Sequence, residues 1–523
     1  MSFVVHSDTP TVLQEIVAKR QQRLAAMREH YPEAEIAASA LASSRPVRDF
    51  TAALAEPGAQ FILECKKASP SKGLIRENFD PVAIARVYGS YAAAISVLTE
   101  PDYFQGDFAY LQAVSAQVNT PVLCKDFIVS TYQVDLARYF GADAILLMLS
   151  VLSDDEYRAL AARAEQLGLH ILTEVSDAEE MHRAAALEAR VIGVNHRNLR
   201  DLSVDLNRSQ ELAALAPKNA LLIAESGIEN NRQVRSISPH VDGFLVGGAL
   251  TAQDDVDMAC RALIYGEHKV CGITSEAQAI AARSAGAVYA GLIFAKRSPR
   301  AVTQTQAKQI CQTSGLQFVG VFSLDDYPHA TEHDTTETAE AIAKLAIDLD
   351  LAAVQLHDVT ENQVITKLAA LLQVQAQSQV HSSSRVKARG KDNLVTGNSK
   401  TANSATANSA TENQHKVIEI WQAHSVKPEE SAINTAPFTP EVARLLFDHG
   451  RGGSGQTFDW QLLPATPEQR QHIQLAGGLN RENIAKAAAQ GCRGLDINSG
   501  LERQPGHKDP AWLQQAFRTI RLY

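Results

Sequence analysis

Hydrophobic positions along the chain fall into two kinds of segment that alternate. Short runs dominated by Val, Ile, Leu and Ala have the length of one buried strand, and longer stretches between them, such as 80–92 and 154–168, carry apolar residues at helical spacing. Up to Tyr265 there are eight short runs: 61–66, 92–100, 122–127, 144–150, 170–175, 191–197, 221–226 and 243–248. Apolar strands separated by helices predict a parallel sheet with right-handed crossovers, and eight such units close most naturally into a (β/α)8 barrel.

The same alternation restarts after Gly266 and again gives eight apolar runs. They are 269–273, 289–294, 318–322, 352–357, 417–423, 444–448, 473–478 and 494–500. Each half of the chain is close to the ~250 residues typical of one such barrel. We therefore predict an α/β protein made of two tandem (β/α)8 (TIM) barrels, with domains 1–266 and 267–523. A doubly wound open sheet is the structural alternative.

Two segments lie outside this repeat. Residues 11–30 form a helical stretch whose apolar side we expect to cap the first barrel; that side consists of Leu13, Ile16, Val17, Leu24 and Met27. Residues 376–416 repeat a Thr-Ala-Asn-Ser-Ala unit and contain almost nothing that can be buried, which predicts a disordered insertion in the second barrel. Four basic residues between 385 and 391 leave a partner-binding role open, although a tolerated loop expansion is the favoured interpretation.

Composition and charge narrow the possible partners. The chain of 523 residues is 45% hydrophobic and 21% charged, with a formal net charge of −10, so it lacks the basic surface of a nucleic-acid-binding protein. No apolar run reaches the roughly 20 residues of a membrane span, and the N-terminus lacks the apolar core of a signal peptide. The six cysteines show neither disulfide nor metal-ligand spacing. We expect a cytoplasmic protein with no nucleic-acid, membrane or metal partner.

Charged and polar residues gather where the predicted strands of the first half end. They are Glu64, Lys66, Lys125, Glu174, Asn195, Arg197, Glu225 and Ser226. In a barrel of this type the carboxyl ends of the strands carry the active site, so these side chains should converge on one mouth as candidate general acids and bases. A single lysine there is often only a solvated strand end, but a whole set of charges is not explained in that way. The glycines of AESGI (224–228) and LVGGAL (245–250) suit a phosphate cradle, although each pair alone is more often ordinary turn chemistry.

In this order and spacing, ECKKASPSKG, VLCKDFIV, LTEV, GVNHRNL, AESGI and FLVGGAL resemble indole-3-glycerol-phosphate synthase over nearly all of residues 1–265. The resemblance implies closure of 1-(2-carboxyphenylamino)-1-deoxyribulose 5-phosphate to an indole, with loss of carbon dioxide and water and without a cofactor. It implies that Lys125 is the general acid, that Lys66 binds the substrate carboxylate, and that Glu174 is the partner base. Less specific roles fall to Glu64 as a proton-sharing partner and to the substrate- and phosphate-contacting residues Ser69, Asn195, Arg197, Glu225, Ser226, Gly227, Gly247 and Gly248.

The second half places Cys271 at the end of its first predicted strand and Asp448 at the end of its sixth. A buried cysteine is usually an inert small side chain, but a thiolate and a carboxylic acid at one rim suffice for an isomerisation. Arg300 lies near the end of the second strand, where its fork suits a carboxylate, or it is an ordinary surface charge. GRGGSG, LAGGL and DINSG supply glycine-rich backbone for a phosphate.

The motifs KVCGIT, SPRAV, VGVF, VQLH, GGSGQTFDW, LAGGL and GLDINSG resemble phosphoribosylanthranilate isomerase over residues 268–523, apart from the insertion. The resemblance implies that Asp448 opens the furanose ring as general acid, that Cys271 removes the C2′ proton, and that Arg300 holds the anthranilate carboxylate. It also implies a phosphate cup and a lining residue: Gly453, Gly477, Gly478, Asn498 and Ser499, with Asp496 in the pocket. Asp358 and Gln422 depart from the family pattern, which usually has glycine and lysine there.

The two resemblances together imply a bifunctional enzyme of tryptophan biosynthesis that acts on small phosphorylated substrates, because the product of the second barrel is the substrate of the first. A tethered pair of this kind is expected to act as a monomer. One alternative is a different phosphosugar isomerisation, as in histidine biosynthesis, but that family resembles a two-aspartate arrangement rather than the Cys271 and Asp448 pair. Another alternative makes the second barrel a non-catalytic scaffold or binding module.

Overall fold

The computed structural model describes residues 11–198, 200–327, 332–360, 362–374, 417–427, 430, 433, 439–449 and 455–521. The predicted insertion at 376–416 and the predicted phosphate ligand Gly453 lie outside these residues. Contacts within the chain divide it into two compact units, with the boundary between Gly266 and Glu267.

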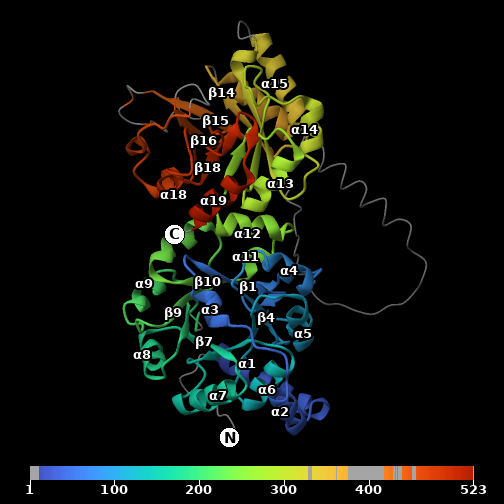
Figure 1. Ribbon diagram of the computed structural model, residues 1–523, viewed down its shortest axis with the longest axis vertical. Helices are drawn as coiled ribbons and strands as arrows, with labels where there is room; N and C mark the ends of the chain where they lie inside the picture. The colour runs from blue at the N-terminus through green and yellow to red at the C-terminus, as the bar shows by residue number, and fades with distance from the viewer. Residues whose placement is uncertain are drawn as a thin grey trace, which may run out of the picture. The chain divides into compact units, whose positions relative to one another are not determined.

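The first unit is a closed barrel of eight parallel strands in the order β1-β10-β9-β8-β7-β6-β5-β4 (Figure 1). The strands are β1 Gln60–Cys65, β4 Ala94–Leu98, β5 Val122–Lys125, β6 Ala144–Met148, β7 His170–Val175, β8 Val191–Asn195, β9 Leu221–Glu225 and β10 Gly243–Val246. The helices between and after them are α4 Pro81–Tyr88, α5 Phe108–Gln117, α6 Thr131–Tyr139, α7 Asp154–Gln166, α8 Ala178–Ala186, α9 Arg208–Ala213, α10 Asn231–Ile237, η1 Ser238–His240, α11 Gly248–Thr251 and α12 Val256–Ile264. A short hairpin, β2 Ala68–Ser69 and β3 Gly73–Leu74, follows the first strand.

Three helices precede this barrel: α1 Thr11–His30, α2 Glu33–Leu41 and α3 Phe50–Leu54. Helix α1 buries four of its five predicted apolar residues, and Met27 packs against the core while remaining partly exposed. It also buries Arg20, which the apolar pattern did not predict.

The second unit is a closed barrel in the order β11-β12-β13-β14-β15-β16-β17-β18. Its strands are β11 Lys269–Cys271, β12 Tyr289–Ile293, β13 Gln317–Ser323, β14 Ala353–His357, β15 Glu419–Val426, β16 Val442–His449, β17 Ile473–Leu475 and β18 Gly494–Ile497. The helices are α13 Glu276–Ala285, α14 Gln304–Ile310, η2 Leu324–Asp326, α15 Glu332–Asp348, a helical segment at 363–374, η3 Trp460–Leu462, α17 Pro467–Arg470, α18 Ile484–Ala488 and α19 Pro510–Arg521. After the last strand, β19 Glu502–Gln504 and β20 His507–Lys508 form an antiparallel hairpin.

The predicted fold class is confirmed, and the open-sheet alternative is wrong because both sheets close. In the first, Ile62 of β1 pairs with Leu245 on one side and Ala94 on the other; in the second, β11 pairs with both β12 and β18. Several predicted runs extend past the observed strands at their carboxyl ends. The run 473–478, for example, ends as a strand at Leu475. The reason is that small and apolar residues continue into the loops that form the barrel mouth.

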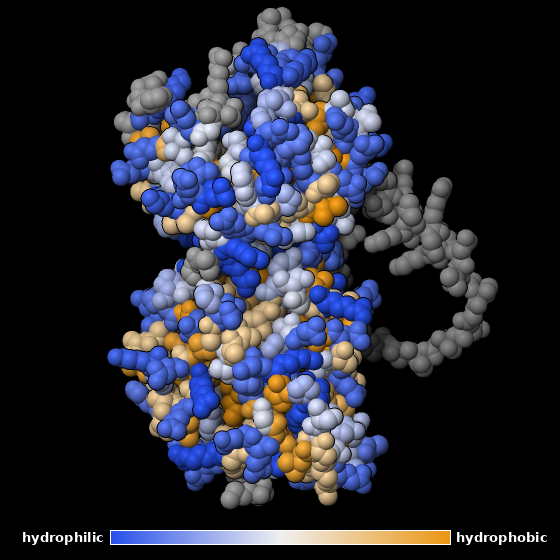
Figure 2. Space-filling model, in the orientation of Figure 1, coloured by the Kyte–Doolittle hydropathy of each residue, from blue (hydrophilic) through white to orange (hydrophobic). Residues whose placement is uncertain are grey.

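The visible surface is mostly hydrophilic, with hydrophobic residues scattered between (Figure 2). Across the described ranges, no helix is both long and apolar enough to cross a membrane. Apolar residues fill the cores of the barrels, and the buried charged residues include Glu64, Glu174 and Glu225 at or next to the carboxyl ends of strands.

Candidate active sites

A cavity of about 590 Å³ opens at the carboxyl ends of the strands in the first barrel. It is lined by nearly all of the residues predicted for this half: Glu64, Lys66, Ser69, Lys125, Glu174, Asn195, Arg197, Ser226, Gly227, Gly247 and Gly248. Glu225 is buried at the end of β9 and contacts Lys125. Val12, Leu13 and Ile16 of α1 also line the cavity, so the N-terminal helix contributes to its wall.

Four charged side chains, Lys125, Glu225, Glu64 and Lys66, form a connected set of ion pairs at this cavity. Lys125 Nζ lies 3.0 Å from Glu225 Oε2 and 3.4 Å from Glu64 Oε2. Lys66 Nζ lies 3.2 Å from Glu64 Oε1. Burial of Glu64 would raise the pKa of its carboxyl, but the two ammonium groups of Lys125 and Lys66 outweigh this and lower that pKa to about 2. Glu64 is therefore a permanent carboxylate that holds both lysines in place.

The surroundings of Lys125 and Glu174 shift the pKa values of both side chains. Burial disfavours the Lys125 ammonium, but the carboxylates of Glu225, Glu64 and Glu174 outweigh it, so the pKa of Lys125 is raised. Burial and the neighbouring Glu225 raise the pKa of Glu174 to about 8, while Asn195 Nδ2 donates to its Oε1 at 3.0 Å. At neutral pH the lysine holds a proton, and the glutamate gains or loses one easily. Such a pair is suited to general acid–base catalysis.

Part of the cavity wall is apolar. Leu98, Phe104, Phe127, Met148 and Leu245 line it, and the Lys66 ammonium lies 5.4 Å from the centroid of the Phe104 ring. An aromatic ring that carries a carboxylate would find an apolar surface and a cation side by side here. Sequence reasoning missed this surface because its residues come from the ends of several strands and loops.

A buried ion pair joins helix α1 to the residue after Lys125. Arg20 Nε donates to Asp126 Oδ1 at 2.9 Å, its Nη2 contacts Oδ2, and Thr99 Oγ1 donates to Oδ2 at 2.7 Å. The pair fixes the backbone at Lys125 against the capping helix. One feature of the sequence indicated this ion pair: Arg20 is a charged residue within the apolar stripe of the helix, four positions after Ile16 and four before Leu24.

The predicted phosphate cradle includes a turn with left-handed backbone. Ser226 has φ 69° and Gly227 φ 76°, so two consecutive residues adopt the left-handed region. His196 holds this turn, because its Nδ1 lies 3.1 Å from the Ser226 carbonyl oxygen. A Cβ atom on Gly247 would lie 2.7 Å from Glu64 Oε1, so only glycine fits between the cradle and the charged centre.

The second barrel brings Cys271 and Asp448 to one rim, because β11 and β16 are parallel members of the same sheet. Burial raises the pKa of the Cys271 thiol, and the nearby Lys269 opposes this. Lys269 Nζ is buried and donates to Asp496 Oδ2 at 2.8 Å. Burial raises the pKa of Asp448 to about 7, and the charge of Asp496 adds to the effect. A carboxylic acid that keeps its proton near neutral pH therefore shares the rim with the thiol.

Arg300 and Asn498 meet at the glycine that follows Cys271. A Cβ atom on Gly272, which has φ +73°, would lie 2.7 Å from Arg300 Cδ and 2.8 Å from Asn498 Oδ1. On the other side of the barrel, a Cβ on Gly477 would lie 2.8 Å from Asp448 Oδ1. Gly478 and Ser499 lie in the loops after β17 and β18, beyond the ends of the observed strands. Sequence reasoning missed Lys269, which stands inside a short buried strand, and the hairpin residues Glu502 and Lys508.

Asp358, one of the two departures from the family pattern, has φ 58°. This is the left-handed conformation that favours glycine, and the Ser323 hydroxyl donates to Asp358 Oδ2. The departure therefore lies in a strained turn after β14 and not at the proposed acid or base. Gln422, the other, lies within β15.

Across the part of the chain that the structure describes, no group of three or more His, Cys, Asp or Glu side chains is arranged to hold a metal ion.

Comparisons with known proteins agree with this division of the chain. The family model described as indole-3-glycerol phosphate synthase matches residues 13–263, and the model described as N-(5'-phosphoribosyl)anthranilate isomerase matches residues 268–396 and 399–519. The chain is similar to tryptophan biosynthesis proteins TrpCF of Vibrio cholerae (45% identical, covering 92% of this chain and 90% of the relative), of Yersinia pestis (44%, 99% and 96%) and of Salmonella typhi (43%, 98% and 100%). The chain therefore belongs to the TrpCF family of bifunctional tryptophan biosynthesis enzymes, which join an indole-3-glycerol phosphate synthase to a phosphoribosylanthranilate isomerase.

Proposed function

We propose that residues 267–523 isomerise N-(5-phosphoribosyl)anthranilate with Asp448 as the acid and Cys271 as the base. We propose that residues 1–266 then close the product to indole-3-glycerol phosphate with Lys125 as the acid. The observation that carries the proposal is the first cavity, which Lys66, Lys125, Glu64 and Glu174 line together with Gly227, Gly247 and Gly248. The alternative of a scaffold barrel is not favoured, because the second barrel has its own buried acid and thiol.

In the isomerase half, Asp448 donates its proton to the furanose ring oxygen, and the ring opens to an imine. Cys271 then removes the C2′ proton, which gives an enolamine that becomes the deoxyribulose. A pKa of about 7 suits Asp448 to this step, because the carboxyl holds a proton at neutral pH and can release it. Arg300 binds the anthranilate carboxylate, and the backbone around Gly477, Gly478 and Asn498 binds the phosphate.

In the synthase half, the substrate carries a carboxylate at one end and a phosphate at the other. Lys66 binds the carboxylate beside the apolar surface around Phe104, and Gly227, Gly247 and Gly248 bind the phosphate. Lys125 protonates the ketone oxygen to a hydroxyl while the ring carbon attacks the ketone carbon, and Glu174 stabilises the cationic ring nitrogen. Carbon dioxide then leaves from that ring carbon, the hydroxyl leaves as water, and Glu174 accepts the proton that the ring system loses. The carboxylates of Glu64 and Glu225 keep Lys125 protonated between turnovers.

To test this, phosphoribosylanthranilate is added to the purified protein and indole formation is measured from the absorbance of the indole chromophore. Lys125→Met should stop the process at the deoxyribulose intermediate, and Cys271→Ala should stop it one step earlier while still converting added intermediate. Lys218→Met, which changes an exposed lysine of the same barrel, is the matched control. Continued indole formation by the Lys125 variant, or a normal isomerase rate in the Cys271 variant, would contradict the assignment.

We also propose that the enzyme works in the cytoplasm as a monomer. All six cysteines are outside disulfides, which suits a reducing compartment, and one chain supplies both sets of active-site residues. Light scattering of the purified protein at micromolar concentration should give the mass of one chain, 56.7 kDa.

A further inference from the structure

The hairpin that follows the last strand of the second barrel carries two buried charged residues that neither reaction step uses. The side chains of Glu502 in β19 and Lys508 in β20 are 3% and 0% exposed. A buried charge is costly unless it is paired, so these residues need specific partners. Their partners are the residues proposed to bind the two ends of the substrate.

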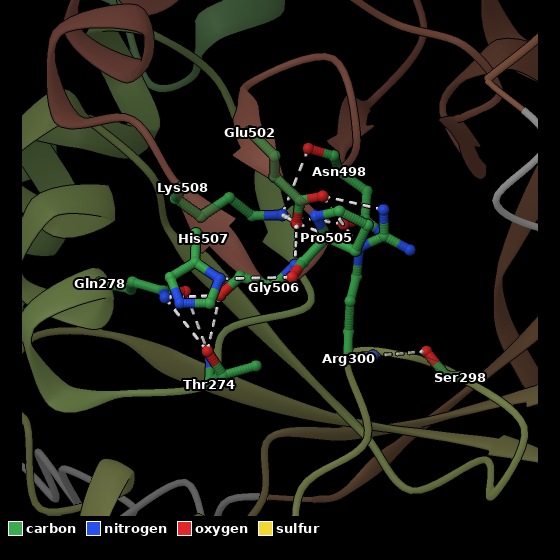
Figure 3. A network of polar contacts seen from close by, with 10 residues as sticks. All are labelled: Thr274, Gln278, Ser298, Arg300, Asn498, Glu502, Pro505, Gly506, His507 and Lys508. Atoms are coloured by element: carbon green, nitrogen blue, oxygen red, sulfur yellow. Dashed lines mark hydrogen bonds and ion pairs between the residues drawn. The ribbon is translucent and has the colours of Figure 1, made fainter.

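Glu502 binds Arg300 through both carboxylate oxygens. Arg300 Nε lies 3.0 Å from each oxygen, and Nη2 lies 2.8 Å from Oε2 (Figure 3). These bonds use the edge of the guanidinium formed by Nε and Nη2. The other edge, which includes Nη1, points away from Glu502 and has the fork geometry that suits a carboxylate.

Lys508 connects the same carboxylate to Asn498. Its Nζ contacts Glu502 Oε1 and donates to Asn498 Oδ1 at 2.8 Å and to the Asn498 carbonyl oxygen at 3.2 Å. Asn498 and Arg300 both pack against Gly272, the residue after Cys271. One chain of contacts therefore runs from the proposed carboxylate ligand to the proposed phosphate loop and passes beside the proposed base.

The turn of the hairpin is fixed to the loop after β11. The Gly506 carbonyl oxygen accepts a hydrogen bond from Thr274 Oγ1 at 2.8 Å and another from Gln278 Nε2 at 2.7 Å (Figure 3). Hydrogen bonds therefore attach both the strands and the turn of the hairpin to the barrel.

The charges of this cluster do not balance. Arg300, whose side chain is 9% exposed, and Lys508 are positive, whereas Glu502 supplies one negative charge. Burial lowers the pKa of Lys508, and Glu502 opposes that effect. One positive charge is left in a nearly buried place, and an anionic substrate would complete the cluster.

We propose that Glu502 and Lys508 are positioning residues of the isomerase half, in which Glu502 orients Arg300 toward the substrate carboxylate and Lys508 holds Asn498 in the phosphate cup. The proposal rests on the proposed function of Arg300 and Asn498. It makes Glu502 a determinant of specificity for substrates whose ring carries a carboxylate.

The test of Glu502 is the variant Glu502→Gln, which removes the charge and keeps the shape. The isomerase KM should rise about tenfold with little change in kcat, because a charge-assisted bond that orients the ligand is lost. Discrimination against phosphoribosylaniline, which lacks the carboxylate, should fall by a similar factor. In an Arg300→Lys background the same substitution should add little. Gln504→Ala, an exposed position on the same hairpin, should change none of these quantities.

Equal losses on both substrates, or full additivity with Arg300→Lys, would overturn the role of Glu502. A normal KM in Arg300→Lys alone would show instead that the underlying assignment of Arg300 is wrong. Conversion of added deoxyribulose intermediate by the first barrel should stay unchanged in every variant. If Glu502→Gln does not fold, Glu502→Asp gives the same comparison with a shortened carboxylate.

The test of Lys508 uses inorganic phosphate as a competitive inhibitor of the isomerase. Lys508→Met should weaken that inhibition about tenfold, because Asn498 loses its support. Unchanged inhibition by phosphate in a folded Lys508→Met variant would overturn this half of the proposal.

Discussion

Replacing Glu64 by Gln should destabilise the first barrel strongly, although the two side chains have nearly the same shape. Glu64 is buried and ionised, and it lies between the ammonium groups of Lys66 and Lys125 at 3.2 and 3.4 Å. The substitution removes the negative charge and leaves the two cations facing each other. Removing one partner of a buried ion pair typically lowers the free energy of unfolding by about 3 to 5 kcal/mol.

The shift in proton affinity gives a similar magnitude. The pKa of Glu64 falls from its ordinary value of 4.5 to about 2, and at about 1.4 kcal/mol per pKa unit this corresponds to about 3 kcal/mol of unfolding free energy at pH 7. Because the folded pKa is depressed, this contribution is complete above pH 4.5 and is lost as the pH falls through 2. At pH 3 the difference between the wild type and Glu64→Gln should have shrunk to about 1.4 kcal/mol.

The assay is urea unfolding followed by two signals. The three tryptophans, Trp421, Trp460 and Trp512, all lie in the second unit, so their fluorescence follows that barrel alone, whereas circular dichroism follows both. Only the dichroism transition that has no fluorescence counterpart should move in Glu64→Gln. Glu229→Gln is the matched control, because Glu229 forms an exposed pair with Lys72 and should change the free energy by less than about 1 kcal/mol.

A loss below about 1 kcal/mol at pH 7, or a loss that stays constant between pH 7 and pH 3, would refute the reasoning. Either result would mean that the lysines, and not Glu64, adjust their proton affinity to the buried environment.

The remaining predictions concern the two pH profiles and one strained turn. The kcat/KM of the synthase half should rise as the pH passes through about 8, where Glu174 ionises to act as a base, and Glu174→Gln should remove this dependence. The isomerase kcat should fall as the pH rises through about 7, because Asp448 must hold a proton. Asp448→Asn should lower kcat roughly 100-fold or more and abolish the fall with pH. A fall with pH that persists in Asp448→Asn would contradict the assignment of Asp448 as the acid. Asp358→Gly should be about 1 kcal/mol more stable than Asp358→Ala in urea unfolding followed by tryptophan fluorescence, since only glycine relieves the left-handed backbone; equal stabilities would argue against strain at this turn.

The sequence was sufficient for the barrels because their strands are buried on both faces. In β6, Ala144–Met148, every residue is buried, and such a run stands out from its surroundings without any knowledge of its neighbours. Charged residues at the ends of these runs were equally visible, so Lys66, Lys125 and Glu174 were found from position alone. Their convergence followed from the rule that parallel strands end at one rim.

Partners that are distant in sequence left no such signal. Lys269 meets Asp496 from 227 residues away, and Arg300 meets Glu502 from 202 residues away. No local pattern marks either pair, and a lysine inside a short strand or a glutamate after the last strand has many ordinary explanations. The apolar wall around Phe104 was missed for the same reason, because it is assembled from several segments.

The buried ion pair between Arg20 and Asp126 has a consequence for folding during translation. Helix α1 leaves the ribosome early, but the carboxylate that anchors it follows 106 residues later. Until the third strand has emerged and joined the growing sheet, the guanidinium has no counter-charge, and the helix cannot settle over the opening. The helix is therefore made before the charge that anchors it, and its buried ion pair can form only after the chain has been translated through Asp126.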